Sequence, residues 1–109
     1  MVGKKVKLTA STDYKLRELG ARIKRARLRR NISAEMLSEK AGIDESTFYA
    51  IERGAATVSI GVYAAVLFVL GIDNDFDTIA IDEKAKKQLY EQNLVKRKRA
   101  SKQRSHLKI

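Results

Sequence analysis

Apolar residues recur with helical spacing in the first third of the chain and predict a long helix there. Between about Thr12 and Arg30 they stand at positions i, i+3, i+7 and i+10, which places them on one helical face. They are Leu16, Leu19, Ile23 and Ala26. The opening stretch MVGKKVKLTA shows no sustained helical period, so we expect a flexible basic arm over residues 1–11.

Two short helices joined by a tight turn are predicted next. Ser33 is a good N-cap for a helix over 34–41, and Gly42 is suited to end it because glycine adopts a left-handed backbone without steric cost. Asp44 caps a third helix over about 45–53. The apolar positions of this pair are Leu37, Ala41, Ile43, Phe48 and Ile51, and the small one is Ser38. This pattern is typical of a helix-turn-helix, whose second helix enters the major groove, although an ordinary helical hairpin is the alternative.

The following stretch predicts a fourth helix that is apolar on every side. It opens at Val58 or Ser59 and ends near Leu70. Its 13 residues from Ile60 to Ile72 fall short of the roughly 20 that span a bilayer. A helix that is apolar all round is buried against its own core and against something else. We expect part of it to form a dimer interface, with a central core helix of a monomer as the alternative. The expected interface residues are Val62, Val66, Phe68 and Val69.

Weaker patterns fill the last third of the chain. Residues 74–81 predict one more short helix, which completes a predicted domain over residues 12–81. A basic C-terminal helix or tail follows over residues 82–109. Its apolar and semipolar positions make a marginal amphipathic helix, and they are Ala85, Leu89, Gln92 and Val95. The part beyond Lys96 is expected to be disordered alone. The chain as a whole is predicted to be all-α.

The composition removes several classes of enzyme. A chain of 109 residues is one domain's worth, and 44% hydrophobic residues suffice for a modest core. The absence of cysteine removes disulfides, thiolate metal sites and cysteine nucleophiles, and a lone His106 leaves no histidine for a catalytic triad or a zinc site. No glycine-rich phosphate loop precedes a helix. We therefore expect no enzyme, no metal and no cofactor. Because no apolar signal region follows Met1, we expect a cytoplasmic, nucleoid-associated protein.

The charges are distributed unevenly along the chain. Residues 1–31 hold eleven Lys/Arg against two Asp/Glu, residues 32–95 hold five against eleven, and the last fourteen hold seven against none. The net charges of these segments are +9, −6 and +7, which return the total of +10. A mildly acidic body between two basic ends favours a polyanionic partner, most often nucleic acid, with solvated tails as the alternative. The run KRKRASKQR is expected either to contact DNA or to remain solvated.

The run LGARIKRARLRRNISAEMLSEKAGIDESTFYAIERG resembles the helix-turn-helix domain of the XRE or phage-repressor type, and the resemblance covers roughly residues 16–80. The stretch SIGVYAAVLFVLG is similar to the fourth helix of XRE-type antitoxins related to HipB, which accompany HipA-type kinase toxins. This resemblance implies a compact five-helix bundle that forms a homodimer and binds palindromic double-stranded operator DNA. It also implies a HipA-type kinase toxin, or the partner of one, as a further binding partner.

The resemblance also implies roles for individual residues. An internal ion pair falls on Arg27 and Glu52, in the first helix and in the ERG signature. The base-contacting positions fall on Asp44, Glu45, Ser46, Tyr49 and Ala50. The positions that match phosphate contacts are Ser33, Thr47 and Arg53, and Arg29 and Arg30 add positive charge from the flank.

Several residues depart from the family pattern. Ala34 stands where many relatives carry a glutamine that braces the recognition helix. Asp44 and Glu45 place two acids where DNA phosphates are expected: Asp44 is most simply an N-cap, and Glu45 either accepts a hydrogen bond from cytosine or repels DNA. Tyr49 is bulkier than the residue often found there, and either contacts a base or sugar or is merely exposed to solvent.

The leading hypothesis from the sequence is a homodimeric, sequence-specific transcriptional regulator. It would act as a repressor of its own operon and as the DNA-binding antitoxin of a toxin–antitoxin pair, and this last step rests on the resemblance alone. The rival is a protein-interaction module of helix-turn-helix fold with only non-specific affinity for DNA. Ala34, Asp44 and Glu45 favour the rival.

Overall fold

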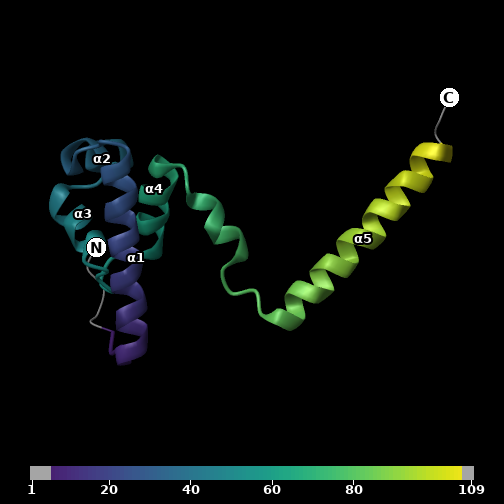
Figure 1. Cartoon of the computed structure of the whole chain (residues 1–109), viewed down its shortest axis with the longest axis horizontal. Coiled ribbons are helices and arrows are strands. Elements are labelled where there is room, and N and C mark those ends of the chain that lie inside the picture. The colour runs from purple at the N-terminus through teal and green to yellow at the C-terminus, as the bar shows by residue number, and fades with distance from the viewer. Residues whose placement is uncertain (1–5, 107–109) are drawn as a thin grey trace. The chain divides into compact units, whose positions relative to one another are not determined.

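The structure is a computed structural model that describes the backbone of residues 6–106, and the side chains of these residues except 85, 86 and 98–106. Within this range it contains only helices and no strand, so the all-α class is confirmed (Figure 1). The elements are α1 (Ala10–Arg29), α2 (Ala34–Ala41), α3 (Glu45–Glu52), α4 (Ile60–Leu70), the 3₁₀ helix η1 (Asp73–Thr78) and α5 (Glu83–His106).

The chain divides into two compact units, one up to Phe76 and the other from Asp77 onward. This boundary lies five residues before the end of the domain predicted over residues 12–81. The predicted N-terminal arm lies partly outside the described residues, and its last two residues already belong to α1. No helix in the described part of the chain is long and apolar enough to cross a membrane.

Each of the four α-helices in the first unit starts at a capping side chain. The oxygens of Thr9, Ser33, Asp44 and Ser59 accept hydrogen bonds from the backbone amides three residues onward, at 3.1, 3.1, 2.8 and 3.4 Å respectively. Each cap satisfies an amide that the helix itself leaves without a partner. The cap at Thr9 also explains why α1 begins two residues before the predicted Thr12. Local chemistry therefore fixes where these helices begin.

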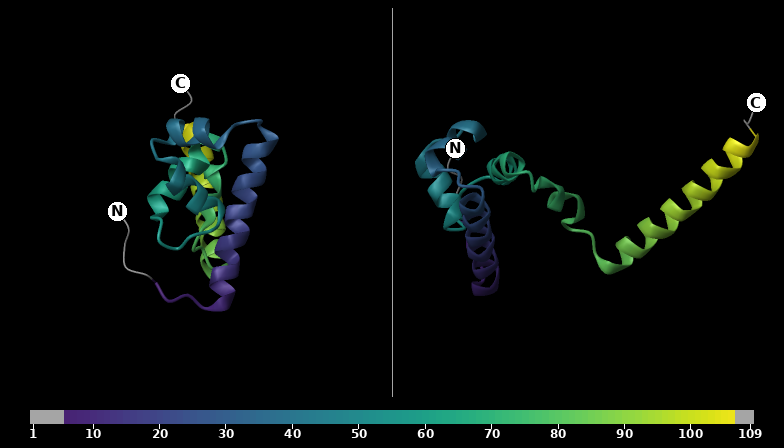
Figure 2. Two further views of the ribbon diagram at one scale, coloured as in Figure 1. Left: turned by 90° about the vertical axis from the view of Figure 1, so that its left-hand side faces the viewer. Right: turned by 45° about the horizontal axis from the view of Figure 1, so that its top comes forward.

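The core of the first unit forms where the four helices meet. α2 packs against α3 and α4, and α1 packs against the same two helices (Figures 1 and 2). The buried apolar side chains are Ile23, Ala26, Ala34, Leu37, Phe48, Ile51, Tyr63, Val66, Leu67 and Leu70. Burial of a side chain of this size contributes about 1.5–3 kcal/mol, so this cluster is the main source of stability. Ala34, at the first position of α2, belongs to this core.

Two glycines allow α1 to approach the end of α3 backbone to backbone. A Cβ atom on Gly20 would lie 2.6 Å from the carbonyl oxygens of Ile51 and Glu52, and a Cβ on Gly54 would overlap the backbone of Leu16. Gly54 also has a φ of +75°, a conformation that L side chains rarely adopt. Neither position has room for a side chain, so the contact between these helices depends on both glycines.

The chain after α4 differs from its prediction in two ways. The helix expected over 74–81 is the 3₁₀ helix η1, whose sequence DNDFDT is poor in strong helix formers. Ala80 then has a φ of +68°, which stops any helical continuation. The chain beyond Lys96, expected to be disordered, continues α5 to His106; half of residues 97–106 are Lys or Arg, which are good helix formers, and the segment contains neither proline nor glycine.

The predicted amphipathic face of α5 has no partner in the described part of the chain. Leu89 and Val95 are each 47% exposed, and Gln92 is exposed as well. The side chain of Ala85 lies outside the described residues. The described residues of α5 show no buried side chain, so nothing in the second unit covers this helix.

Candidate nucleic-acid interface

α3 has one buried side and one exposed side. Phe48 and Ile51 are completely buried against the core. Ser46, Tyr49 and Arg53, spaced at i, i+3 and i+7, therefore lie on the opposite side, and all three are exposed. Two further predicted base-contacting residues flank this row: Glu45 is exposed and Ala50 is half-buried. The outer face of α3, defined as Glu45, Ser46, Tyr49, Ala50 and Arg53, is thus open to a macromolecular partner.

Asp44 sits at the start of this helix and acts as its N-cap. Its Oδ1 atom accepts hydrogen bonds from the amide of Thr47 at 2.8 Å and from Oγ of Ser46 at 3.3 Å. These bonds, those from Thr47 first, hold the pKa of the Asp44 carboxyl below its ordinary value of 3.8. The negative charge also lies at the positive end of the helix dipole. Asp44 is therefore placed primarily to cap α3.

The residues matched to phosphate contacts occupy helix ends. Ser33 is exposed and its Oγ caps α2 by accepting from the amide of Met36. Thr47 is half-buried in the first turn of α3, and Arg53 is the exposed C-cap of that helix. Helix N-termini present free amides that bind anions, so Ser33 and Thr47 lie where a phosphate would be bound, whereas Arg53 offers a cation at a helix C-terminus.

Two arginines at the end of α1 supply positive charge. Arg29 is exposed, and Arg30 is exposed with its Nη1 donating to the carbonyl of Ala26 at 2.8 Å. This bond satisfies one of the last carbonyls of the helix and limits the directions that Arg30 takes. Both cations complement the negative end of the α1 dipole, independently of any DNA contact.

Arg27 and Glu52 form the expected ion pair between α1 and α3. Nε of Arg27 donates to Oε2 at 2.8 Å and Nη2 to Oε1 at 3.3 Å, and the two side chains are only 11% and 6% exposed. Nη1 of Arg27 also donates to the carbonyl of Ile32 at 3.1 Å, and the guanidinium lies 5.7 Å from the centre of the Phe48 ring. The hydrogen bonds to Glu52 raise the pKa of Arg27 above its ordinary value, so the guanidinium remains charged. Its position fixes α3 against α1 from the buried side.

Tyr63 holds the loop between α3 and α4, and sequence reasoning missed this role. Its Oη donates to the carbonyl of Ala55 at 2.7 Å, while its ring is buried in the core. Burial raises the pKa of the phenol above its ordinary value, so it remains a donor at neutral pH. The signal that could have revealed this anchor is a polar hydroxyl in an otherwise apolar helix, eight residues after Ala55.

The predicted dimer-interface residues of α4 are not on one surface. Val66 is completely buried in the core of the chain itself, which corrects its assignment to an interface. Val62 and Val69 are half-buried and pack against the same core. Phe68 alone among the four is exposed, at 70%. The helix is apolar all round, so the sequence pattern gave no sign of which face turns inward.

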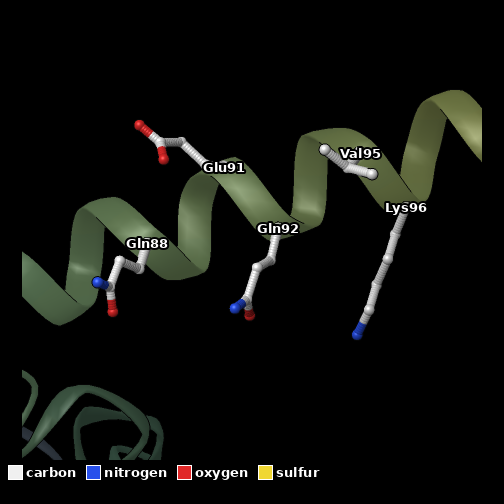
Figure 3. A pocket seen from close by; sticks show the side chains of 5 residues that line it. All are labelled: Gln88, Glu91, Gln92, Val95 and Lys96. Atoms are coloured by element: carbon white, nitrogen blue, oxygen red, sulfur yellow. The ribbon is translucent and has the colours of Figure 1, made fainter.

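One further set of side chains lines an open surface on α5. Gln88, Glu91, Gln92, Val95 and Lys96 all come from this helix and are all exposed (Figure 3). Figure 3 shows Gln88, Gln92 and Lys96 pointing to one side of the helix and Glu91 and Val95 to the other. Small-molecule sites enclose most of their ligand, which this surface does not. The described residues also contain no cluster of His, Cys, Asp or Glu suited to a metal ion.

The fold and the outer face of α3 together define a helix-turn-helix domain: α2 and α3 are joined by the turn at Gly42, and α1 and α4 support them. A family model described as a helix-turn-helix domain matches residues 18–76, more than half of the chain, and the chain belongs to this family. Membership suggests a DNA-binding regulator.

Other comparisons add little. A chain of a solved structure titled "SinR protein/SinI protein complex" is similar, with a TM-score of 0.47 and 23% identity over 73% of this chain and 98% of that chain. No curated protein matches the sequence.

Proposed function

We propose that this protein is a sequence-specific DNA-binding transcriptional regulator that reads the major groove with the outer face of α3. The observation that carries the proposal is the two-sided burial of this helix. Phe48 and Ile51 are completely buried, whereas Tyr49 is 44% exposed and Ser46 and Arg53 are exposed beside it. Polar groups on a helix held from behind are what direct readout of base edges requires.

The chemistry of the outer face suits particular contacts. Glu45 accepts a hydrogen bond from the amino group of a cytosine, and the ring of Tyr49 packs on a thymine methyl or a sugar. The amides at the start of α2 and the side chains of Ser33 and Arg53 bind phosphates on either side. The ion pair behind α3 gives this face a fixed orientation, which base readout needs.

The protein acts as a homodimer on an inverted repeat in this proposal. Two α3 helices then enter successive major grooves about 34 Å apart. In this proposal the protein represses its own operon. The resemblance of the α4 sequence to HipB-type antitoxins extends the proposal to the DNA-binding antitoxin of a toxin–antitoxin operon, with a HipA-type kinase toxin or its partner protein as the second ligand.

The basic segments at both ends add affinity without sequence preference in this proposal. The last fourteen residues alone carry seven Lys/Arg and no acid. Each phosphate that such residues neutralise contributes about −0.9 to the slope of log K against log salt concentration. Sequence preference therefore comes from α3, and most of the salt dependence comes from the ends.

The test is a DNA titration with the DNA upstream of the gene and a scrambled copy, each at two salt concentrations. Glu45→Ala and Tyr49→Ala are compared with Glu39→Ala and Tyr14→Ala, which remove an exposed acid on α2 and an exposed tyrosine on α1. We expect the wild type and both controls to prefer the upstream DNA. The α3 variants lose this preference, by about tenfold or more for each lost base contact. An unchanged preference in both α3 variants contradicts the readout by this face.

The second candidate function is a protein-interaction module with non-specific DNA affinity. It is favoured by the acids Asp44 and Glu45 at the start of α3, both exposed where phosphates would lie. Equal binding to upstream and scrambled DNA, lost together as salt rises, supports this second function over the first.

A further inference from the structure

The outer side of α4 is an apolar surface that the other described residues of the first unit leave largely uncovered. Ile60 and Phe68 are each 70% exposed, and the half-buried Ala64 stands between them, since positions i, i+4 and i+8 follow one another along the same side of a helix. Gly61 is exposed beside this row and Ala65 is half-buried. We call these five residues, Ile60, Gly61, Ala64, Ala65 and Phe68, the outer face of α4.

This face is unusual for a surface helix. The opposite side of α4 supplies Tyr63, Val66, Leu67 and Leu70 to the core, so an ordinary helix in this place would carry polar residues outward. Instead, the chain has no charged residue between Arg53 and Asp73. Exposed contiguous apolar surface of this kind marks a site of interaction.

We propose that the outer face of α4 binds the same face of a second copy, with the two α4 helices antiparallel and the twofold axis at Ala64. This proposal rests on the homodimer of the proposed function and names its contact surface. The order of side chains along the row is large, small, large, and it reads the same in both directions. An antiparallel pair therefore places Ile60 of one copy against Phe68 of the other, and Ala64 against its own counterpart.

The small residues decide how closely the helices approach. Packed helices lie about 8–10 Å apart with Cα atoms on a radius of about 2.3 Å. At the upper end of this range the facing Cα atoms of two Ala64 residues are about 5.4 Å apart, a separation that the small alanine side chains allow and that lies within the disulfide range. The row from Ile60 to Phe68 spans about 12 Å of helix, at about 1.5 Å per residue.

The distribution of charge favours the outer face of α4 over other surfaces of the chain as the place where two copies meet. Each chain carries a net charge of +10, so two copies repel each other at most approaches. The outer face of α4 is a neutral, apolar surface on which this repulsion is weakest. A pair of short helices buries less than the roughly 1,200–2,000 Å² of a standard stable interface, so the dimer dissociates on dilution.

The test uses single-cysteine variants of the full chain, which contains no cysteine of its own. Ala64→Cys is oxidised mildly and the cross-linked fraction is read on a non-reducing gel. Tyr14→Cys, on an exposed tyrosine of α1, is the control. We expect Ala64→Cys to cross-link at least tenfold faster than the control, because facing Cα atoms fall within disulfide range. A mixture of Ile60→Cys and Phe68→Cys cross-links faster than either variant alone if the helices are antiparallel.

A second measurement separates this contact from the proposed function. Sedimentation equilibrium compares wild type with Phe68→Lys and Tyr14→Lys, and circular dichroism checks that each variant is folded. We expect Phe68→Lys to raise the dimer Kd at least tenfold and Tyr14→Lys to leave it unchanged.

The outcomes that overturn the proposal differ from those that overturn the homodimer. If Phe68→Lys dimerises as the wild type does, or Ala64→Cys cross-links no faster than the control, the α4 contact is wrong and the homodimer stands. If the wild type is monomeric at all concentrations, and also when it is bound to the upstream DNA, both the α4 contact and the homodimer are wrong. Capture of a different protein on α4 by a monomeric wild type likewise overturns the α4 contact.

Discussion

The ion pair between Arg27 and Glu52 is buried, so removing one partner destabilises the fold far more than removing one partner of a surface ion pair. The two side chains are 11% and 6% exposed, so removing one partner leaves a charge inside the protein without a counterion. Such a loss typically costs about 3–5 kcal/mol of unfolding free energy. We therefore expect this loss for Arg27→Met and for Glu52→Met, out of a total of about 5–15 kcal/mol for a domain.

The double variant Arg27→Met/Glu52→Met is expected to be more stable than either single variant. It leaves no unpaired charge, and methionine fills most of the space of both side chains. What remains lost is the hydrogen bond of Arg27 to the carbonyl of Ile32 and its contact with Phe48, so the double variant costs about 1–2 kcal/mol. The measurement is urea unfolding followed by circular dichroism, since the chain has no tryptophan, at one fixed protein concentration.

Arg17→Met provides the matched control for this cycle. Arg17 pairs with Asp13 at 2.9 Å on the same helix, but these side chains are 70% and 41% exposed. Solvent screens such a pair, and its loss costs less than about 0.5 kcal/mol. If the losses at Arg27 and Glu52 simply add in the double variant, the two residues are not coupled and the reasoning from burial is refuted.

Three further predictions concern the scaffold of α3. Gly20→Ala destabilises the fold by about 1–3 kcal/mol, because its Cβ meets the carbonyl oxygens of Ile51 and Glu52 at 2.6 Å. The control Gly61→Ala, whose Cβ meets only Ser59 Oγ at 3.9 Å, leaves the stability equal or raises it. Urea unfolding measures both variants, and an unchanged stability of Gly20→Ala contradicts the close approach. Tyr63→Phe costs about 0.5–1.5 kcal/mol through the lost bond to Ala55, and faster hydrogen exchange in the loop from 54 to 59 is the signature to measure. The pKa of Asp44 is lowered in the folded protein, so its cap stabilises α3 above pH 3.8, and this contribution is lost as the pH falls through the folded pKa. An NMR titration measures this pKa, and a midpoint at or above 3.8 would count against the cap. Asp44→Asn removes this pH dependence of the stability.

The sequence was most informative where structure depends on neighbours along the chain. Ser33, Asp44 and Ser59 were recognisable as helix starts because a cap is made by a residue and an amide three positions later. The bounds of α2 followed directly. Arg27 and Glu52, 25 residues apart, were paired through the family resemblance, because nothing local links them.

Contacts between distant segments were beyond the reach of pattern reasoning. Gly20 lies mid-helix and showed no local reason to be glycine; the reason is the backbone of Ile51 and Glu52 on another helix. The inward face of α4 was not predictable either, because periodicity is uninformative when every position is apolar. Val66 was therefore placed at an interface, although it lies in the core, and the exposure of Ile60 was missed.

The backbone contact at Gly20 and Gly54 has a consequence for how this protein changes over generations. The position of α3 against α1 is set by main-chain atoms and by a buried ion pair, and neither involves the residues at 45, 46, 49 and 50. Mutations at Glu45, Ser46 and Tyr49, which are exposed, therefore leave this scaffold intact, and in the proposed function they change which DNA sequence the helix prefers. If the proposed function holds, duplicated copies of the gene acquire new DNA targets through a few substitutions, with little change in folding stability.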